Sequence, residues 1–318
     1  MIDHARLRAD RRTRTLAAMA HDDLDVLVLG REANARFASG ARRLWTAGTR
    51  PFAPGCVVVR ETGAVHVLST WDDGMPPELD HDHLYGTTWN PAVLTDEVGA
   101  IPGIPGATRI GVDGMTARAH ALLSAVAPGA TLVDATAPML AARRRKSADE
   151  VACIVHAVAV AEAGVAAALD AAASGVTERE LTGRYLEAMA RLGVTTPLTE
   201  GTVDGRIPTD RRIDTDDVIT FTGGAVFEGY AGVVGRTRDV DDTWSTLAGV
   251  LHPGATGADI AAAHPHATAR GIGLGLEPPI TGADVLEQGM TLAITTPRWA
   301  DTVRITADGA ELLGRPAP

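Results

Sequence analysis

The chain has 318 residues, which is longer than one typical domain, and its 45% hydrophobic content is enough to build large buried cores. Its formal net charge of −11 argues against nucleic-acid binding, because phosphate backbones are held by basic surfaces. An acidic balance is also the ordinary state of a soluble cytoplasmic protein, and cytoplasm is the compartment we expect.

The chain shows no targeting or membrane segment in its pattern. The first residues, MIDHARLRADRRTRTL, are charged throughout and lack the apolar core of a signal peptide. The most apolar stretch, residues 151–173, is interrupted by His156 and Glu162, so it indicates a buried helix of a soluble protein rather than a membrane span. Cys56 and Cys153 lie in apolar surroundings and are interpreted as small buried hydrophobic residues, not as a disulfide or metal site.

Strands and helices alternate along the first half of the chain. Hydrophobic periodicity predicts a helix over 6–22, a buried strand over 24–30, a hairpin over 55–70, strands over 109–114 and 131–136, and a helix over 116–127. This alternation predicts a small α/β domain over residues 1–140.

A second domain is predicted over residues 141–318. Ser147 and Glu150 form a helix-opening capping box, and Thr177 and Glu180 repeat the pattern. Strands, hairpins and short helices follow, including a helix over 257–268. The second domain is therefore expected to be α+β, with two helices followed by a largely antiparallel sheet.

One hairpin in this domain carries no acid. The segment FTGGAVFEGYAGVVGRT, residues 221–237, indicates two strands over 218–223 and 229–237 joined by a glycine-rich turn. Neither strand has a carboxylate inside it, and the second closes on Gly235, Arg236 and Thr237.

The order of these motifs resembles that of the pita-bread family, which includes methionine aminopeptidase, aminopeptidase P, prolidase and creatinase. The family's R-x-x-K-S-x-x-E segment stands here at Arg143–Glu150. The resemblance continues through SGVTERELTGRYLEAMARLG, the hairpin ending in Arg-Thr, RGIGLGLEPP, GMTLAITTP and DTVRITADGAELL. Upstream, NARFASGARRLW and RPFAPGCVVV resemble the creatinase-like N-terminal domain. The resemblance implies a pita-bread C-terminal domain preceded by a smaller α/β creatinase-like domain.

The family's metal chemistry depends on two Asp, one His and two Glu, which together hold two divalent cations. The resemblance places these five positions on Thr222, Val233, Arg270, Thr295 and Ala300. A guanidinium cannot ligate a cation and would repel one. The resemblance therefore implies that no dinuclear metal site forms at the family position, and we expect no metal and no cofactor.

Creatinase is the family precedent for working without metal, and GYAGVVGRTRDVDD is closer to its hairpin than to that of a peptidase. Its acid/base histidine falls on Arg206, however, and the acid beside its Arg-Thr pair falls on Gly235. Creatine-like hydrolysis is therefore not expected.

Where relatives have an acidic cation site, the resemblance implies that this chain has arginines and small hydroxyl residues. The concave face of the sheet would present the five positions above, with Arg206 on the entering loop. Because the planar guanidinium fork suits a carboxylate or phosphate, we predict a small anionic ligand. Arg206 or Arg270 could instead point to solvent or pair with a structural acid. Arg236 is a candidate ligand contact, although its place in the family's Arg-Thr pair favours a structural role.

Few groups are available for proton transfer. Glu277 falls near the family's second, substrate-contacting histidine and is our candidate acid or base, with Arg270 and Arg206 as its catalytic partners. The alternative is a glutamate that caps the loop before two prolines. Trp299 could stack on a flat ligand or fill the core.

His264 and His266 flank Pro265 within the predicted helix at 257–268. Two helix positions at this spacing diverge, so a surface kink is favoured over a pair of ligands.

The N-terminal domain contributes three further candidates. In creatinase-like dimers the N-terminal domain of one protomer reaches toward the active site of the other. Trp45, Arg50 and Phe52 are therefore candidate substrate contacts within a homodimer, or else a hydrophobic anchor for their loop.

Two functions fit this sequence. The first is a repurposed, metal-independent enzyme that acts on a small carboxylated, amino-acid-derived substrate by isomerisation, elimination, cyclisation or C–N cleavage, in a bacterial biosynthetic pathway. The second is a catalytically inactive pseudoenzyme that serves as a binding or scaffold protein. A metallopeptidase with a displaced metal site is the least supported.

Overall fold

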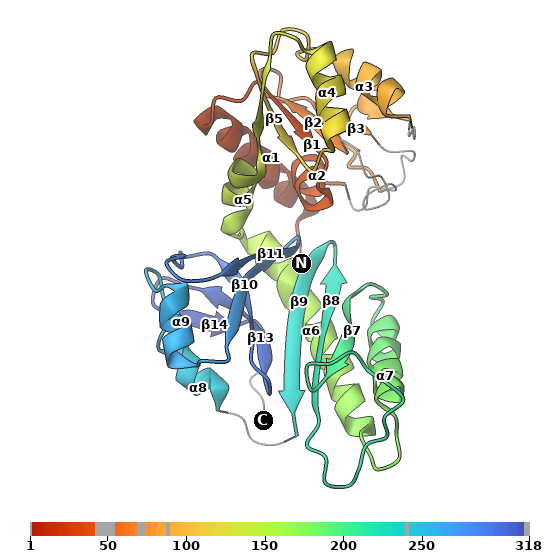
Figure 1. Ribbon diagram of the computed structural model, residues 1–318, viewed down its shortest axis with the longest axis vertical. Coiled ribbons are helices and arrows are strands. Elements are labelled where there is room, and N and C mark those ends of the chain that lie inside the picture. Colours follow the sequence, from red (N-terminus) through yellow and green to blue (C-terminus); the bar gives the residue numbers. More distant parts are fainter. Residues whose placement is uncertain (1, 42–54, 69–73, 87–89, 239–241, 315–318) are drawn as a thin grey trace. The chain divides into compact units, whose positions relative to one another are not determined.

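The structure is a computed structural model that describes residues 2–41, 55–68, 74–86, 90–238 and 242–314. The chain divides into two compact units, Asp3–Arg143 and a second that begins at Arg144. The boundary expected between residues 140 and 141 lies close to this division. Each unit is built around one sheet (Figure 1).

The N-terminal unit has a mixed sheet with the strand order β4-β3-β2-β1-β5-β6. Strand β1 pairs antiparallel with β2 and parallel with β5. Valine, leucine and isoleucine side chains from the central strands pack with α3 and α4 into one core. The elements in chain order are α1 (His4–His21), β1 (Val26–Leu29), α2 (Glu32–Ser39), β2 (Cys56–Val59), β3 (Val65–Leu68), η1 (His81–His83), β4 (Leu84–Tyr85), α3 (Pro91–Gly99), β5 (Arg109–Asp113), α4 (Ala117–Val126), β6 (Thr131–Asp134) and α5 (Thr136–Arg144). The helices, hairpin and strands predicted for this half are confirmed.

The C-terminal unit has a sheet with the strand order β11-β10-β12-β13-β9-β8-β7, to which β14 adds by pairing with β13. Its strand pairings are antiparallel, as the sequence predicts. The elements are α6 (Ala148–Ala171), α7 (Glu178–Arg191), β7 (Pro197–Val203), β8 (Thr220–Phe227), β9 (Tyr230–Thr237), α8 (Thr243–Ala248), α9 (Gly257–Ala263), β10 (Thr268–Gly273), β11 (Gly275–Ile280), β12 (Thr291–Thr295), β13 (Ala300–Ile305) and β14 (Ala310–Leu312). Both capping boxes expected at Ser147 and Thr177 are present.

The β8–β9 hairpin differs from its prediction at the turn. Strand β8 continues to Phe227, so the glycines at 223 and 224 lie inside the strand. The turn consists of Glu228 and Gly229, with φ values of 50° and 86°. Two central residues with positive φ match the twist of antiparallel strands, which is why this short turn closes the hairpin.

Helices cover one face of the C-terminal sheet. A Cβ on Gly232 of β9 would lie 2.5 Å from the backbone nitrogen of Val158 in α6. A Cβ on Gly223 of β8 would lie 2.6 Å from the ring of Tyr185 in α7. These glycines let the two helices approach the strands closely, and Figure 1 shows α6 running along β8 and β9. Leu247 of α8 and Ile260 of α9 share a core with Leu292 of β12 and with β13.

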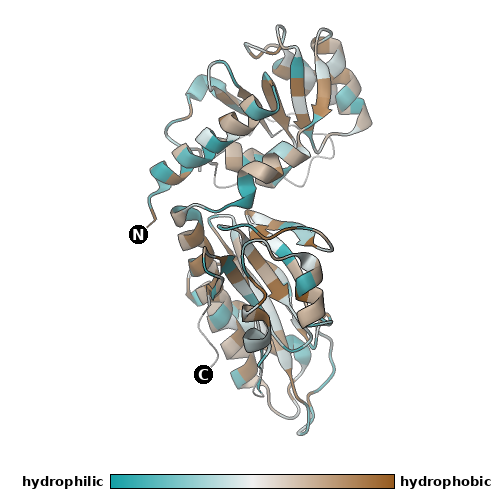
Figure 2. Ribbon diagram, turned by 90° about the vertical axis from the view of Figure 1, so that its left-hand side faces the viewer, coloured by the Kyte–Doolittle hydropathy of each residue, from teal (hydrophilic) through white to brown (hydrophobic). Residues whose placement is uncertain are grey.

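Helix α6 is long and apolar enough to cross a membrane by length and composition alone. Its buried residues face β8, β9 and α7, and several strands in each unit carry the brown hydrophobic colour (Figure 2). We conclude that α6 is the core helix of its unit, as its interrupting polar residues predict.

Two further features concern the ends of elements. Helix α9 ends at Ala263, and not near residue 268 as predicted, because the residue before a proline is pushed out of the helical region; His264 is extended, with φ −144° and ψ 101°. His264 and His266 therefore lie in a turn, with ring centroids 6.3 Å apart. At the sheet edge, β11 contains two consecutive prolines, Pro278 and Pro279.

The close approach of α6 to β9 can be tested by adding one methyl group. Gly232→Ala should lower the free energy of unfolding by about 1–3 kcal/mol, because the helix backbone must shift. Gly183→Ala is the matched control: no atom lies within 4 Å of its added Cβ, and alanine favours a helix, so it should stabilise by up to about 1 kcal/mol. Urea denaturation measures both, and equal effects would contradict the close contact.

Candidate functional site

The face of the C-terminal sheet opposite α6 and α7, called the open face below, holds the positions singled out in the sequence. Side chains alternate between the two faces along a strand, so the register fixes which residues share a face. One row across the strands pairs Thr222 with Gly235, Gly235 with Ala300, and Ala300 with Thr295. The same row ends at Thr202 on β7 and Thr268 on β10.

A second row lies two residues along the same strands. It contains Val233 opposite Gly224, and Arg270 opposite Ala293. The Thr302 hydroxyl joins β13 to β9 here, because it donates to the Val233 carbonyl at 3.0 Å and accepts from the Val233 N–H at 2.9 Å. The two rows therefore bring Thr222, Val233, Arg270, Thr295 and Ala300 onto one face.

These five residues do not form a metal-binding set. Paired divalent cations need carboxylate or imidazole ligands, whereas this face presents hydroxyl, aliphatic and guanidinium groups. Among the described residues, no group of three or more His, Cys, Asp or Glu side chains is placed to hold a metal ion. The two metals that the resemblance implies for relatives do not fit here.

Arg270 is the charged residue of the two rows. Its side chain is exposed, and its guanidinium donates from Nε and Nη2 to the backbone carbonyl of Glu277, at 3.2 and 3.1 Å. These bonds leave Nη1 and part of Nη2 available, and a guanidinium in a fixed orientation is suited to a carboxylate.

The Glu277 carboxylate is held away from Arg270. Both of its oxygens accept from the Lys146 ammonium at 2.9 Å, and both side chains are buried. The third Lys146 donor meets the Arg144 carbonyl at 3.1 Å. A Cβ on Gly271 or Gly273 would collide with this carboxylate, which places it on the side opposite the Arg270 side chain. The two groups thus share a backbone contact but face different sides of β10.

Arg236 also faces the helix side. Its guanidinium bonds the buried Asp301 carboxylate at 2.6 Å, donates to the Ala300 carbonyl at 2.8 Å, and lies 3.7 Å from Glu162 of α6. Burial raises the pKa of Asp301 to about 6, although the Arg236 charge opposes that rise. This position favours the structural interpretation of Arg236, which clamps β9 to β13.

The remaining candidates lie apart from the two rows. Arg206 is exposed in the tight turn after β7, the opposite edge of the strand order from β10 and β11. Trp299 is only 5% exposed and lies in the core beside Trp244, with ring centroids 6.4 Å apart, which favours core filling. Trp45, Arg50 and Phe52 lie outside the described residues.

Lys146 and Asp301, the buried partners of Glu277 and Arg236, were not predicted from the sequence. Both belong to quoted segments, but their roles depend on contacts over 131 and 65 residues of chain. The Lys146–Glu277 pair could have been suspected from the sequence. A lysine just before a helix and a glutamate among apolar residues each need a charged partner if they are buried.

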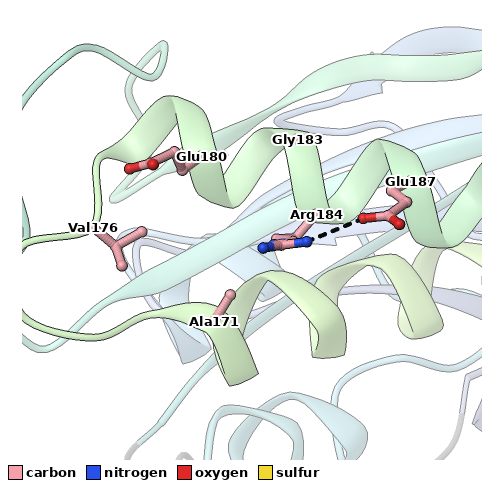
Figure 3. Close-up of a pocket in the computed structure, with 6 residues that line it drawn as sticks. All are labelled: Ala171, Val176, Glu180, Gly183, Arg184 and Glu187. Carbon is pink, nitrogen blue, oxygen red and sulfur yellow. Dashed lines mark hydrogen bonds and ion pairs between the residues drawn. The ribbon is translucent and has the colours of Figure 1, made fainter.

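A hollow of about 420 Å³ lies between the end of α6 and α7. Figure 3 shows its lining residues, with Arg184 directed toward Glu187 at 3.3 Å. It is formed by the helices and contains none of the candidate residues: Ala171, Val176, Glu180, Gly183, Arg184 and Glu187 line it.

Solved structures match this arrangement over nearly the whole chain. The prolidase from Thermococcus sibiricus aligns with a TM-score of 0.78 and 18% identity, covering 100% of this chain and 98% of that one. The chain has the pita-bread fold. The dipeptidase PepE from Mycobacterium ulcerans gives 0.69 and 23%, and the N-terminal domain of FACT complex subunit SPT16 from chickpea, Cicer arietinum, gives 0.70 and 15%, each covering 100% and 98%. No family model matches the chain.

The Arg236–Asp301 pair gives a pH-dependent prediction. The pKa of Asp301 is about 6 in the native state and about 3.8 in the unfolded chain, so between these values the native carboxyl keeps a proton that the unfolded one has lost. The contribution of Asp301 to the free energy of unfolding therefore falls as the pH rises from about 4 to 6. In Arg236→Leu the lost countercharge raises that pKa further and extends the fall above pH 6. We expect a loss of about 3–5 kcal/mol at pH 8 and a smaller loss at pH 5.

Urea denaturation at both pH values measures this difference. Arg236→Leu combined with Asp301→Asn is the control, because it removes the buried charge and should recover much of the stability at pH 8. An Arg236→Leu loss that is the same at pH 5 and pH 8 would contradict the assignment.

Proposed function

We propose that this chain uses the pita-bread fold without metal chemistry and binds a small carboxylated molecule on the open face of its C-terminal sheet. The observation that carries the proposal is Arg270. It stands where the resemblance implies a metal ligand, it is exposed, and its guanidinium is oriented by the Glu277 carbonyl. A charge-assisted, bidentate contact to a carboxylate is the interaction that such a group makes best.

The neighbouring residues support an anion rather than a cation. Thr295 lies diagonally across from Arg270 on the next strand, and its hydroxyl can donate to a second carboxylate oxygen. Thr222 offers another half-buried hydroxyl in the same row as Thr295. No acid on either row competes for the guanidinium.

Turnover of the bound molecule is the second candidate. The observation that favours it is the buried Lys146–Glu277 pair directly behind Arg270, which could exchange a proton with a ligand if the pair opened. The carboxylate faces Lys146 and not the open face, so binding is the better supported function. A pure scaffold role gains some support from the similarity to a domain of a subunit of the FACT complex.

Three expectations from the sequence accompany this proposal. We expect the protein to be cytoplasmic and homodimeric. We also expect Trp45, Arg50 and Phe52 to take part in the interface or in ligand contact, and crosslinking with a Trp45→Ala variant would test that role.

The proposal is tested with propionate and the neutral amide propionamide as probes. Propionate should bind in ligand-observed NMR, and Arg270→Ala should weaken it by about 10- to 100-fold, since a hydrogen bond to a charged group contributes about 1.5–3 kcal/mol. Propionamide should bind weakly to both. Arg179→Ala, an exposed arginine of α7 that pairs with Asp210, is the matched control and should leave propionate binding unchanged.

Metal addition provides a further check. Manganese or cobalt ions, or a chelator, should not alter propionate affinity, and calorimetry should detect no saturable uptake of two cations per chain. Two tightly bound cations, or hydrolysis of an Xaa-Pro dipeptide that needs them, would refute metal independence.

A further inference from the structure

The charges on the open face and its apolar residues indicate which charged group the bound molecule lacks. We propose that the ligand is a carboxylic acid without a free ammonium group, such as an N-acylated amino acid, and that the site rejects amino acids and peptides with a charged amino end. This inference rests on the proposed function, since it concerns the body of the molecule whose carboxylate Arg270 would hold.

The electrostatics of the two rows disfavour a ligand with a positive charge. The described residues of the two rows carry one formal charge, the Arg270 guanidinium, and no carboxylate. An ammonium bound beside them would lose water without gaining a countercharge, and it would be repelled by the guanidinium. The site therefore selects against any ligand that brings a positive charge onto this face.

The nearby acids point away from the open face. Glu277 faces Lys146, and Asp301 faces Arg236, both on the side of the sheet away from Arg270. These carboxylates already pair with the buried Lys146 at 2.9 Å and the partly buried Arg236 at 2.6 Å, so using one for an ammonium would break an existing ion pair. Glu228 lies in the hairpin turn beyond the rows.

An apolar floor lies next to Arg270 on the open face. Ala231, Ile272 and Ala293 form a buried cluster on this face. Leu198, Val226 and Val233 cover it and remain partly exposed, so they are the side chains that a ligand would touch. Contact with this floor favours an uncharged aliphatic or acyl group, whose transfer from water is favourable.

The size of Val233 also favours a ligand without a positive charge. Its side chain lies on the same row as Arg270 and next to the Gly224 backbone, and the resemblance implies an aspartate there in relatives. Valine and aspartate are close in size, so the difference between them is mainly charge. A site that keeps this shape and omits the charge is suited to the neutral counterpart of an ammonium-bearing ligand.

Four alanine derivatives separate the two charges of an amino acid. N-acetylalanine carries only the carboxylate, alanine carries both charges, N-acetylalaninamide carries neither, and alaninamide carries only the ammonium. In ligand-observed NMR we expect N-acetylalanine to bind at least about tenfold more tightly than alanine, a difference of about 1.4 kcal/mol. The two amides should bind more weakly still.

A charge placed on the floor should change this preference. Val233→Asp adds a carboxylate without adding bulk, so it should strengthen alanine binding and weaken N-acetylalanine binding, closing or reversing the tenfold difference. Val233→Asn has the same shape without the charge and should keep the wild-type order. Circular dichroism and thermal melts of both variants show whether the fold is retained, and if Val233→Asp unfolds, the four wild-type affinities still decide.

The outcomes distinguish this inference from the function on which it rests. If none of the four compounds binds in an Arg270-dependent way, the proposed function fails and the inference fails with it. If alanine binds as tightly as N-acetylalanine and both depend on Arg270, carboxylate binding stands and the inference alone is overturned. Loss of the preference in Val233→Asn would also overturn it, because shape and not charge would then set the choice.

Discussion

The contact between α6 and the middle of β9 determines much of the C-terminal unit. Gly232 lets the strand lie against the helix backbone at Val158, so the helix is fixed along β8 and β9. The start of α6 then places Lys146 beside Glu277, and its fourth turn brings Glu162 toward Arg236. The Lys146–Glu277 pair and the contact of Glu162 with Arg236 thus lie along the helix that Gly232 allows to approach β9.

This arrangement separates charges between the two faces of the sheet. The helix face holds carboxylates that are already paired with a lysine or an arginine, and desolvating both partners is tolerable because each is hydrogen-bonded. The two rows of the open face retain hydroxyls, aliphatic groups and one guanidinium among the described residues. With carboxylates on the helix face and a guanidinium on the open face, the sheet can attract an anion to the open face. The two rows on that face present no carboxylate that could hold a pair of cations.

Local sequence signals were sufficient for most elements but not for the side chains of the site. The capping boxes at Ser147 and Thr177 and the alternation along β9 and β13 depend on neighbours within four residues, so they can be recognised without the fold. The family resemblance, and not local spacing, put five candidate residues on one face of the sheet, and the strand register gives them a common face. The hairpin turn was misplaced, because two glycines inside a strand, one of them packed against Tyr185, look the same in sequence as a pair that turns the chain. The direction of Glu277 could not be predicted, since it depends on a lysine 131 residues away.

The edge of the C-terminal sheet limits how copies of the chain can associate. Strand β11 carries Pro278 and Pro279, and a proline has no N–H to offer to a neighbouring strand. Of any two consecutive residues in an edge strand, one directs its backbone N–H toward the neighbouring strand and the other directs it away from the sheet. Because both residues here are prolines, the free edge of β11 lacks one N–H donor, whichever of the two faces outward. A second molecule cannot extend the sheet here by regular strand addition, which protects the protein from edge-to-edge aggregation. Any homodimer must therefore form through side chains or through another edge.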